Sequence, residues 1–176
     1  SVDEAVLAEY KEKFLQQMGN DLNTSMGVTA LFDVLKAKTN DATKLALIGD
    51  FDSVLSLGLL EKAAAQGNAR AQSILGDLCR DGEGTEMDAA RAFQLYAQAA
   101  EQGYPPAQCA LGYCYEVGSG TAEDKTKAVE WYEKAAQRGH ATAQCNLAYC
   151  YEQGIGVAED KTKAVEWYAR AAEQEH

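Results

Sequence analysis

The chain has 176 residues, and its 47% hydrophobic and 24% charged residues match ordinary soluble globular proteins, which argues against intrinsic disorder. Its net charge of −11, from 16 basic and 27 acidic residues, argues against self-standing nucleic-acid binding, because that binding needs clustered lysine and arginine. The sequence has no apolar run of the roughly 18 residues that a membrane span needs. Its five cysteines, without a secretory signal pattern, predict free thiols in a cytoplasmic protein.

Residues 1–58 contain three stretches in which apolar residues recur at helical spacing. The first stretch ends at Gly19, the second begins after Thr24, and the third ends at Gly58. Three amphipathic helices joined by short loops predict part of a helical bundle.

The rest of the chain contains a tandem repeat of 36 residues. Residues 104–139 and 140–175 are identical at 23 of 36 aligned positions, and residues 68–103 match residues 104–139 at 13 positions. Self-similarity at a fixed period predicts a repeated pair of secondary-structure elements, and here the pattern predicts three such units.

Each repeat reads as two helices. The first helix stops at a Gly-x-Gly sequence, whose residues tolerate positive φ, and the second begins after an aspartate in the N-cap position. These aspartates are Asp88, Asp124 and Asp160. One helix pair cannot bury its apolar stripe alone, so the repeats are expected to stack into an α-solenoid.

The shared pattern is Ala-x-x-x-Leu-Gly-x-x-Tyr, then Gly-x-Gly, then Asp-x-x-x-Ala-x-x-Trp-Tyr-x-x-Ala-Ala, and it resembles the Sel1-like repeat, a relative of the tetratricopeptide repeat. The resemblance implies a right-handed α-solenoid of helix-turn-helix units that binds a protein or peptide. It divides the chain into a bundle segment (1–58), a partial repeat (59–67) and three full repeats (68–103, 104–139 and 140–176). Cys79 and Ala148 depart from the pattern, where it has tyrosine and glycine.

The bundle segment carries a second resemblance, which spans most of residues 8–60. The segments from Phe14 to Thr24 and from Phe51 to Leu59 resemble the helical-bundle domain that follows the catalytic core of bacterial cysteinyl-tRNA synthetase. This implies a parent that is a cysteine–tRNA ligase and contacts tRNA. The chain itself has neither the ATP-binding loops of that family nor a zinc-type cysteine and histidine grouping, so it is predicted to be non-catalytic, without cofactor or metal.

Two functions follow from these resemblances. In the first, the chain is the non-catalytic C-terminal region of a cysteinyl-tRNA synthetase-like protein, whose repeats form a scaffold for a protein or peptide. In the alternative, the chain is a self-standing Sel1-like adaptor, whose N-terminal helices only cap the solenoid. In the first reading tRNA is bound only through the parent enzyme.

The first helix of each repeat is expected to line the concave surface of the solenoid. The exposed positions of this helix are expected beside its core leucine, which gives one row of residues in each of the three repeats. Ser73 is one member of the row in the first repeat. Tyrosines there suit a peptide groove, since a phenol joins a large apolar body to a polar tip. The candidate partner-binding residues are Arg70, Asp77, Arg80, Cys109, Tyr113, Glu116, Cys145, Asn146, Tyr149 and Glu152. The alternative is that these residues form an ordinary solenoid surface.

Three further expectations concern single residues and the C-terminus. Cys114 and Cys150 are expected to pack in the core as small hydrophobic residues. His140, at a repeat boundary, is expected to have a structural role. Only five residues follow Ala171, so the last helix is predicted to be partly open and to allow self-association.

Overall fold

The computed structural model of the protein describes residues 57–174, so the predicted bundle helices of residues 1–56 lie outside this range. The chain divides into two compact units, Ser1–Lys62 and Ala63–His176, and the three full repeats lie in the second. Residues 57–65 are helical, and no strand occurs among the described residues.

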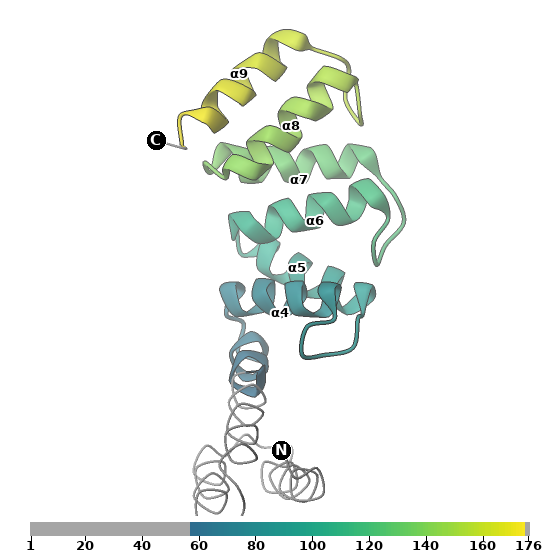
Figure 1. Ribbon diagram of the computed structural model, residues 1–176, viewed down its shortest axis with the longest axis vertical. Coiled ribbons are helices and arrows are strands. Elements are labelled where there is room, and N and C mark those ends of the chain that lie inside the picture. Colours follow the sequence, from purple (N-terminus) through teal and green to yellow (C-terminus); the bar gives the residue numbers. More distant parts are fainter. Residues whose placement is uncertain (1–56, 175–176) are drawn as a thin grey trace, which may run out of the picture. The chain divides into compact units, whose positions relative to one another are not determined.

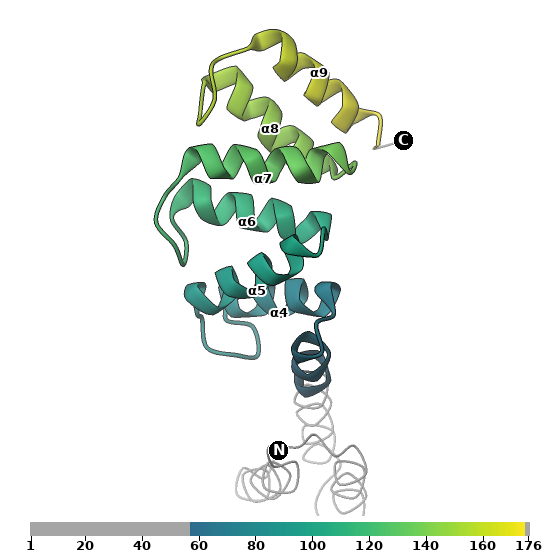
Figure 2. The same cartoon turned by 180° about the vertical axis from the view of Figure 1, so that it is seen from behind.

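The second unit contains paired helices that stack in chain order, from α4 and α5 at one end to α8 and α9 at the other (Figure 1). The view from behind shows the same succession (Figure 2). We call α4, α6 and α8 the A helices, and α5, α7 and α9 the B helices. The stack confirms the predicted α-solenoid. The helices are α4 (Ala69–Asp81), α5 (Ala89–Glu101), α6 (Pro105–Val117), α7 (Lys125–Gln137), α8 (Ala141–Gln153) and α9 (Lys161–Ala172).

Side-chain caps fix where the helices begin. The predicted aspartate caps are confirmed: Asp88, Asp124 and Asp160 accept hydrogen bonds from backbone N–H groups three residues on, at 2.9–3.0 Å. At the start of α8, His140 Nδ1 accepts from the Ala143 N–H at 3.2 Å. These bonds satisfy N–H groups that have no partner within the helix.

The second glycine of the Gly-x-Gly loop allows neighbouring repeats to approach closely. A Cβ atom at Gly120 would lie 2.1 Å from the Ala89 carbonyl oxygen, and one at Gly156 would lie 2.1 Å from the Lys125 carbonyl oxygen. Both glycines also have a φ near +70°. Each loop therefore packs against the start of the B helix in the preceding repeat, where any side chain would collide with backbone.

The core places one tyrosine of each inner B helix against a glycine of the A helix before it. Tyr96 and Tyr132 are 1% and 0% exposed. A Cβ atom at Gly76 or Gly112 would lie only 2.7 Å from the corresponding tyrosine ring. The Leu-Gly pair of the repeat thus leaves room for a ring and lets the two helices pack closely.

Buried glutamines join each A helix to the helix before it. The Nε2 atoms of Gln72, Gln108 and Gln144 donate to the carbonyl oxygens of Ala64, Ala100 and Ala136, at 3.0–3.2 Å. These carbonyls lie in the last turns of the preceding helices and also accept from the N–H groups of Gly67, Gly103 and Gly139, so each glutamine supplies a second hydrogen bond. The same glutamine-to-carbonyl hydrogen bond therefore repeats at the three places where an A helix follows the helix of the preceding repeat.

Candidate partner-binding site

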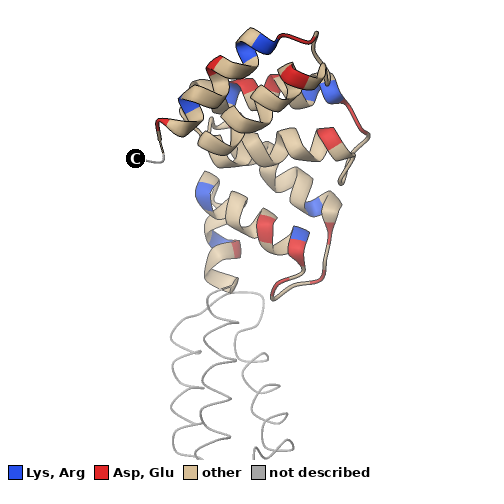
Figure 3. Cartoon of the chain, turned by 45° about the horizontal axis from the view of Figure 1, so that its top comes forward, with Lys and Arg blue, Asp and Glu red and all other residues tan. Residues whose placement is uncertain are grey.

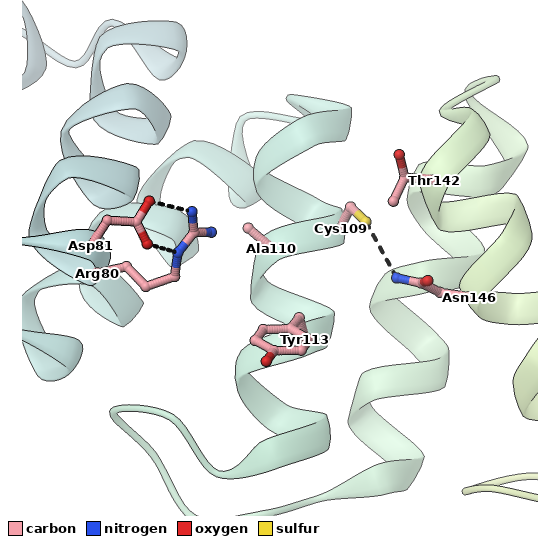
Figure 4. A pocket seen from close by; sticks show the side chains of 7 residues that line it. All are labelled: Arg80, Asp81, Cys109, Ala110, Tyr113, Thr142 and Asn146. Carbon is pink, nitrogen blue, oxygen red and sulfur yellow. Dashed lines mark hydrogen bonds and ion pairs between the residues drawn. The ribbon is translucent and has the colours of Figure 1, made fainter.

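A pocket of about 560 Å³ lies on the A-helix face, the surface formed by α4, α6 and α8 (Figure 4). All of its lining residues belong to A helices, and positions four apart, which share one side of a helix, recur among them. The pocket is open and spans three repeats. Its lining residues are Arg80, Asp81, Cys109, Ala110, Tyr113, Thr142 and Asn146.

One side of the pocket is a fixed ion-pair cluster. Arg80 Nε donates to Asp81 Oδ1 at 2.7 Å and its Nη2 donates to Asp81 Oδ2 at 2.8 Å, as Figure 4 shows. Arg80 Nη1 lies 3.3 Å from Asp77 Oδ1. The bond to Asp81 raises the pKa of Arg80 and lowers the pKa of the Asp81 carboxyl. One cation beside two carboxylates leaves this cluster with a net negative charge.

Acidic side chains of the A helices also hold the tyrosines of the B helices. Tyr132 Oη donates to Glu116 Oε2 at 2.5 Å, and Tyr168 Oη donates to Glu152 Oε2 at 3.2 Å. Burial raises the pKa of the Tyr132 phenol, and the bond to Glu116 raises it further, so the phenol stays protonated. Glu116 and Glu152 therefore have a structural role beside the predicted binding role.

The first repeat makes the same bond from a different position. Tyr96 Oη donates to Asp77 Oδ1 at 2.8 Å. In the 36-residue alignment, Asp77 corresponds to Tyr113, and Arg80 corresponds to Glu116. The carboxylate that accepts the bond thus lies about one helical turn earlier in the first repeat. Arg80 stands where the later repeats have glutamate. This exchange explains why the first repeat has Asp77 and Arg80 where the later repeats have tyrosine and glutamate, which the sequence alone does not explain.

The predicted exposure is wrong at Cys109, which is 7% exposed, and at Ser73, which is 5% exposed. These two residues occupy the same repeat position as Cys145, which is exposed. Asn146 Nδ2 lies 3.8 Å from Cys109 Sγ, so α8 covers this position of α6 (Figure 4). No further A helix covers Cys145 among the described residues.

The remaining predicted residues divide between the pocket and the surface beside it. Tyr113 and Asn146 line the pocket, and Tyr113 is 48% exposed. Tyr149 is 47% exposed at the same position one repeat later. Arg70 is exposed in the first turn of α4, outside the pocket lining.

Sequence reasoning missed two lining residues, Asp81 and Ala110, whereas Thr142 lies in the third predicted row of exposed positions. Asp81 aligns with Val117 and Gln153, so the repeat pattern gives no reason to expect a carboxylate there. The adjacent Arg80 was the available signal, because a neighbouring carboxylate can bind a guanidinium with two hydrogen bonds.

The cysteines and the histidine behave as structural residues. Cys114 and Cys150 are 3% and 1% exposed, which confirms their predicted place in the core. Burial raises the pKa of Cys109, Cys114 and Cys150 to about 11, so these thiols stay protonated at neutral pH. The cap at the start of α8 confirms the structural role of His140.

Neither a metal site nor a membrane span occurs among residues 57–174. No group of three or more metal-binding side chains in this range could hold an ion. None of the helices in this range is both long enough and apolar enough to cross a bilayer.

The chain matches solved structures and one curated relative. It is 40% identical to a Sel1 repeat protein from Oxalobacter formigenes (TM-score 0.62, covering 69% of this chain and 91% of that one). It is 30% identical to c5321, a protective antigen of uropathogenic Escherichia coli with an SLR fold (TM-score 0.64, covering 100% of this chain and 34% of that one). It is also 42% identical over 67 residues to a cysteine–tRNA ligase from Hahella chejuensis, covering 35% of this chain but 14% of the ligase.

The Sel1 repeat model matches residues 52–68, 69–104, 105–140 and 141–176. Each of the three long matches contains one A helix and the B helix that follows it. Because these matches cover well over half of the chain, the protein belongs to the Sel1 repeat family.

Proposed function

We propose that the chain is a non-catalytic scaffold that binds a segment of a partner protein on its A-helix face. The observation that carries this proposal is the pocket of about 560 Å³, which three successive A helices line. Sel1 repeats generally serve in protein–protein interaction. A pocket that spans several repeats suits an extended peptide, since each repeat contributes a similar set of contacts.

The chemistry of the pocket favours binding over catalysis. Asn146 offers an amide, and Tyr113 offers a partly exposed ring with a polar tip, which are groups that position a peptide. Cys109 is the thiol in the lining, but its raised pKa of about 11 leaves it protonated at neutral pH. We propose a cytoplasmic location, in keeping with five cysteines that form no disulfide.

Peptide selection against the full chain tests this proposal. Peptides chosen from a random dodecapeptide library would be measured by calorimetry against the parent chain and against Ala110→Trp, which fills the pocket with an indole. We expect Ala110→Trp to weaken binding at least about tenfold, because the ring occupies the space of the ligand. The matched control is Gln94→Trp on the exposed side of α5, which should change affinity less than about twofold. Equal effects of the two variants would contradict the proposal.

A second candidate function concerns the parent of the chain. We propose that the chain is the C-terminal region of a cysteinyl-tRNA synthetase-like protein, whose repeats recruit a partner to the enzyme. The match to the Hahella chejuensis ligase and the sequence of residues 8–60 support this, although the chain spans 14% of that ligase. In this reading tRNA is bound through the parent enzyme, because the chain alone carries a net charge of −11.

Sequencing the gene upstream of Ser1 separates this candidate from a self-standing adaptor. A nucleotide-binding core with ATP-binding loops would support the synthetase reading, and a start codon directly before Ser1 would support the adaptor. A gel shift with cysteine tRNA at low salt adds an independent check on the chain alone. We expect no shift, since clustered basic residues are needed to hold a phosphate backbone.

A further inference from the structure

Charge is distributed unequally between the two sets of helices. The A helices carry two basic and four acidic residues, whereas the B helices carry seven basic and four acidic residues. Among the A helices, α6 and α8 contain no lysine or arginine, and their charged residues are Glu116 and Glu152. The loops that follow the A helices, residues 82–88, 118–124 and 154–160, are also acidic (Figure 3). The A helices therefore carry a net negative charge and the B helices a net positive one, and loop carboxylates pair with the lysines at the start of α7 and α9.

The negative charge extends to the pocket itself. Arg80 is the basic residue in its lining, and the carboxylates of Asp77 and Asp81 already surround it. The field of Glu116 adds to burial in raising the pKa of Cys109, which places a further negative charge beside the lining. A ligand that enters the pocket thus meets a net negative potential, which favours a cationic group.

Four other aromatic rings, two on B helices (Trp131, Trp167) and two on A helices (Tyr115, Tyr151), already hold cations of the chain. Lys134 Nζ lies 3.6 Å from the centroid of the Trp131 ring, and the Arg170 guanidinium carbon lies 4.5 Å from that of Trp167. The rings of Tyr115 and Tyr151 likewise have Lys127 and Lys163 over them, at 5.4 and 5.1 Å.

The two exposed tyrosines of the A-helix face differ from these rings. In the described part of the chain, no lysine or arginine lies over Tyr113 or Tyr149. Each is nearly half exposed. Their ring faces can attract a cation from outside the chain, and the surrounding carboxylates strengthen that attraction.

We infer that the partner segment is an extended basic peptide, whose lysine or arginine side chains lie over Tyr113 and Tyr149. This inference rests on the proposed scaffold function and adds the chemical class of the partner. Both tyrosines occupy the same position in successive repeats, so one peptide running along the A-helix face passes both rings. The peptide's cations meet a surface whose nearest charges are mostly carboxylates.

Fluorescence anisotropy with three labelled peptides tests the inference. The peptides are four repeats of Lys-Ser-Gly, of Gln-Ser-Gly and of Glu-Ser-Gly, measured against the full chain in 50 mM and 200 mM sodium chloride. We expect the lysine peptide to bind at least about tenfold more tightly than the glutamine peptide at low salt, and the glutamate peptide to bind least. The preference should shrink at high salt, because salt screens exposed charges.

Matched variants locate the binding. Tyr113→Ala combined with Tyr149→Ala should weaken the lysine peptide about tenfold, whereas the corresponding Phe variants keep the rings and should stay within about twofold. Glu116→Gln keeps an acceptor for the tyrosine hydroxyl of α7 but removes the charge, and should weaken binding about threefold. Glu130→Gln on α7 removes the same charge from a B helix and should have almost no effect.

Different results overturn different claims. If the glutamine or glutamate peptide binds as tightly as the lysine peptide, and Ala110→Trp still abolishes binding, the basic preference is wrong and the scaffold function stands. If the lysine peptide binds but neither Ala110→Trp nor the double alanine variant weakens it, it binds the net negative charge elsewhere, and the inference is wrong. If neither these peptides nor library-selected peptides bind, the scaffold function fails as well.

Discussion

α7 and α9 begin with the same eight residues, Lys-Thr-Lys-Ala-Val-Glu-Trp-Tyr, yet they lie in different environments. Val129 of α7 is 7% exposed and the matching Val165 of α9 is 68% exposed. Tyr132 and Tyr168 are 0% and 38% exposed. Because the sequences agree, the difference comes from α8, which packs against α7 and has no counterpart over α9 among the described residues. In a solenoid, the burial of a residue, and so its contribution to stability, depends on whether a further repeat packs over it.

The uncovered face of α9 agrees with the predicted partly open C-terminal helix. Self-association through this face stays a prediction. Light scattering over a range of concentrations checks it: an apparent mass that rises with concentration would support self-association, and a constant monomer mass would contradict it.

The largest expected loss of stability comes from removing a tyrosine that the next repeat buries. Tyr132→Ala should reduce the free energy of unfolding by about 3–5 kcal/mol, because it empties a fully buried site in the core. Tyr168→Ala should cost about 1 kcal/mol, since the ring is partly exposed and its bond to Glu152 is near the surface. Urea unfolding of the full chain, followed by circular dichroism at 222 nm, measures both. Equal losses would show that α8 is not what distinguishes the two tyrosines.

The glycine beneath Tyr132 gives the next largest effect. Gly112→Ala would place a Cβ atom 2.7 Å from the Tyr132 ring and 3.2 Å from the Ala128 carbonyl oxygen. Overpacking of this kind should cost about 1–3 kcal/mol of unfolding free energy. The control is the reverse change in the third repeat, Ala148→Gly, which should cost about 1–2 kcal/mol through helix propensity and the loss of a buried methyl group, without overpacking. A harmless Gly112→Ala would mean that the Tyr132 ring can move aside.

A buried glutamine that lacks one partner offers a stabilising change. Gln102 Nε2 donates to Gln72 Oε1, and Gln174 Nε2 donates to Gln144 Oε1, at 2.8 and 2.6 Å. The second repeat has Arg138 at this position, and its Nη1 donates to the Gly103 carbonyl oxygen instead. Within the described residues, Gln108 Oε1 is left buried without a partner.

Arg138→Gln should therefore raise the free energy of unfolding by about 1 kcal/mol, because a buried acceptor gains its hydrogen bond. Arg138→Ala removes the bond to Gly103 without supplying a donor, and it serves as the control in the same urea experiment. If the glutamine variant is no more stable than the alanine variant, the missing bond to Gln108 has no energetic weight.

The repeat period made the helix pairs, their aspartate caps and the core cysteines predictable, because each follows from local sequence and from one neighbour. The burial of Cys109 and Ser73 was not predictable in this way. Their burial depends on whether the A helix of the next repeat lies over the position. Cys145, at the same repeat position, has no such helix over it among the described residues and is exposed. The bond from Tyr96 to Asp77 was also hidden, since its acceptor lies about one helical turn from the aligned glutamate. Residues 1–56, with the synthetase resemblance, lie outside the described range.

The smallest expected effect is a dependence of stability on pH through His140. Its Nδ1 accepts the Ala143 N–H, so this cap requires the neutral imidazole, and burial lowers the pKa of His140 below its usual value of about 6.5. As the pH falls below 6.5, the unfolded chain binds a proton at this residue before the folded chain does. The stabilising contribution is thus complete above pH 6.5 and is lost as the pH falls through the folded pKa.

His140→Asn keeps an oxygen acceptor at the cap but does not titrate, so it isolates this effect. Urea unfolding at pH 7.5, 6.5 and 5.5 would compare the variant with the parent chain. The carboxylates titrate alike in both proteins and cancel in the difference. We expect the parent to lose roughly 0.5 kcal/mol relative to the variant between pH 7.5 and 5.5, about the low end of an N-cap contribution. A difference that stays constant over this range would mean that His140 takes up its proton equally well in the folded chain, and that the cap at the start of α8 does not depend on the neutral ring.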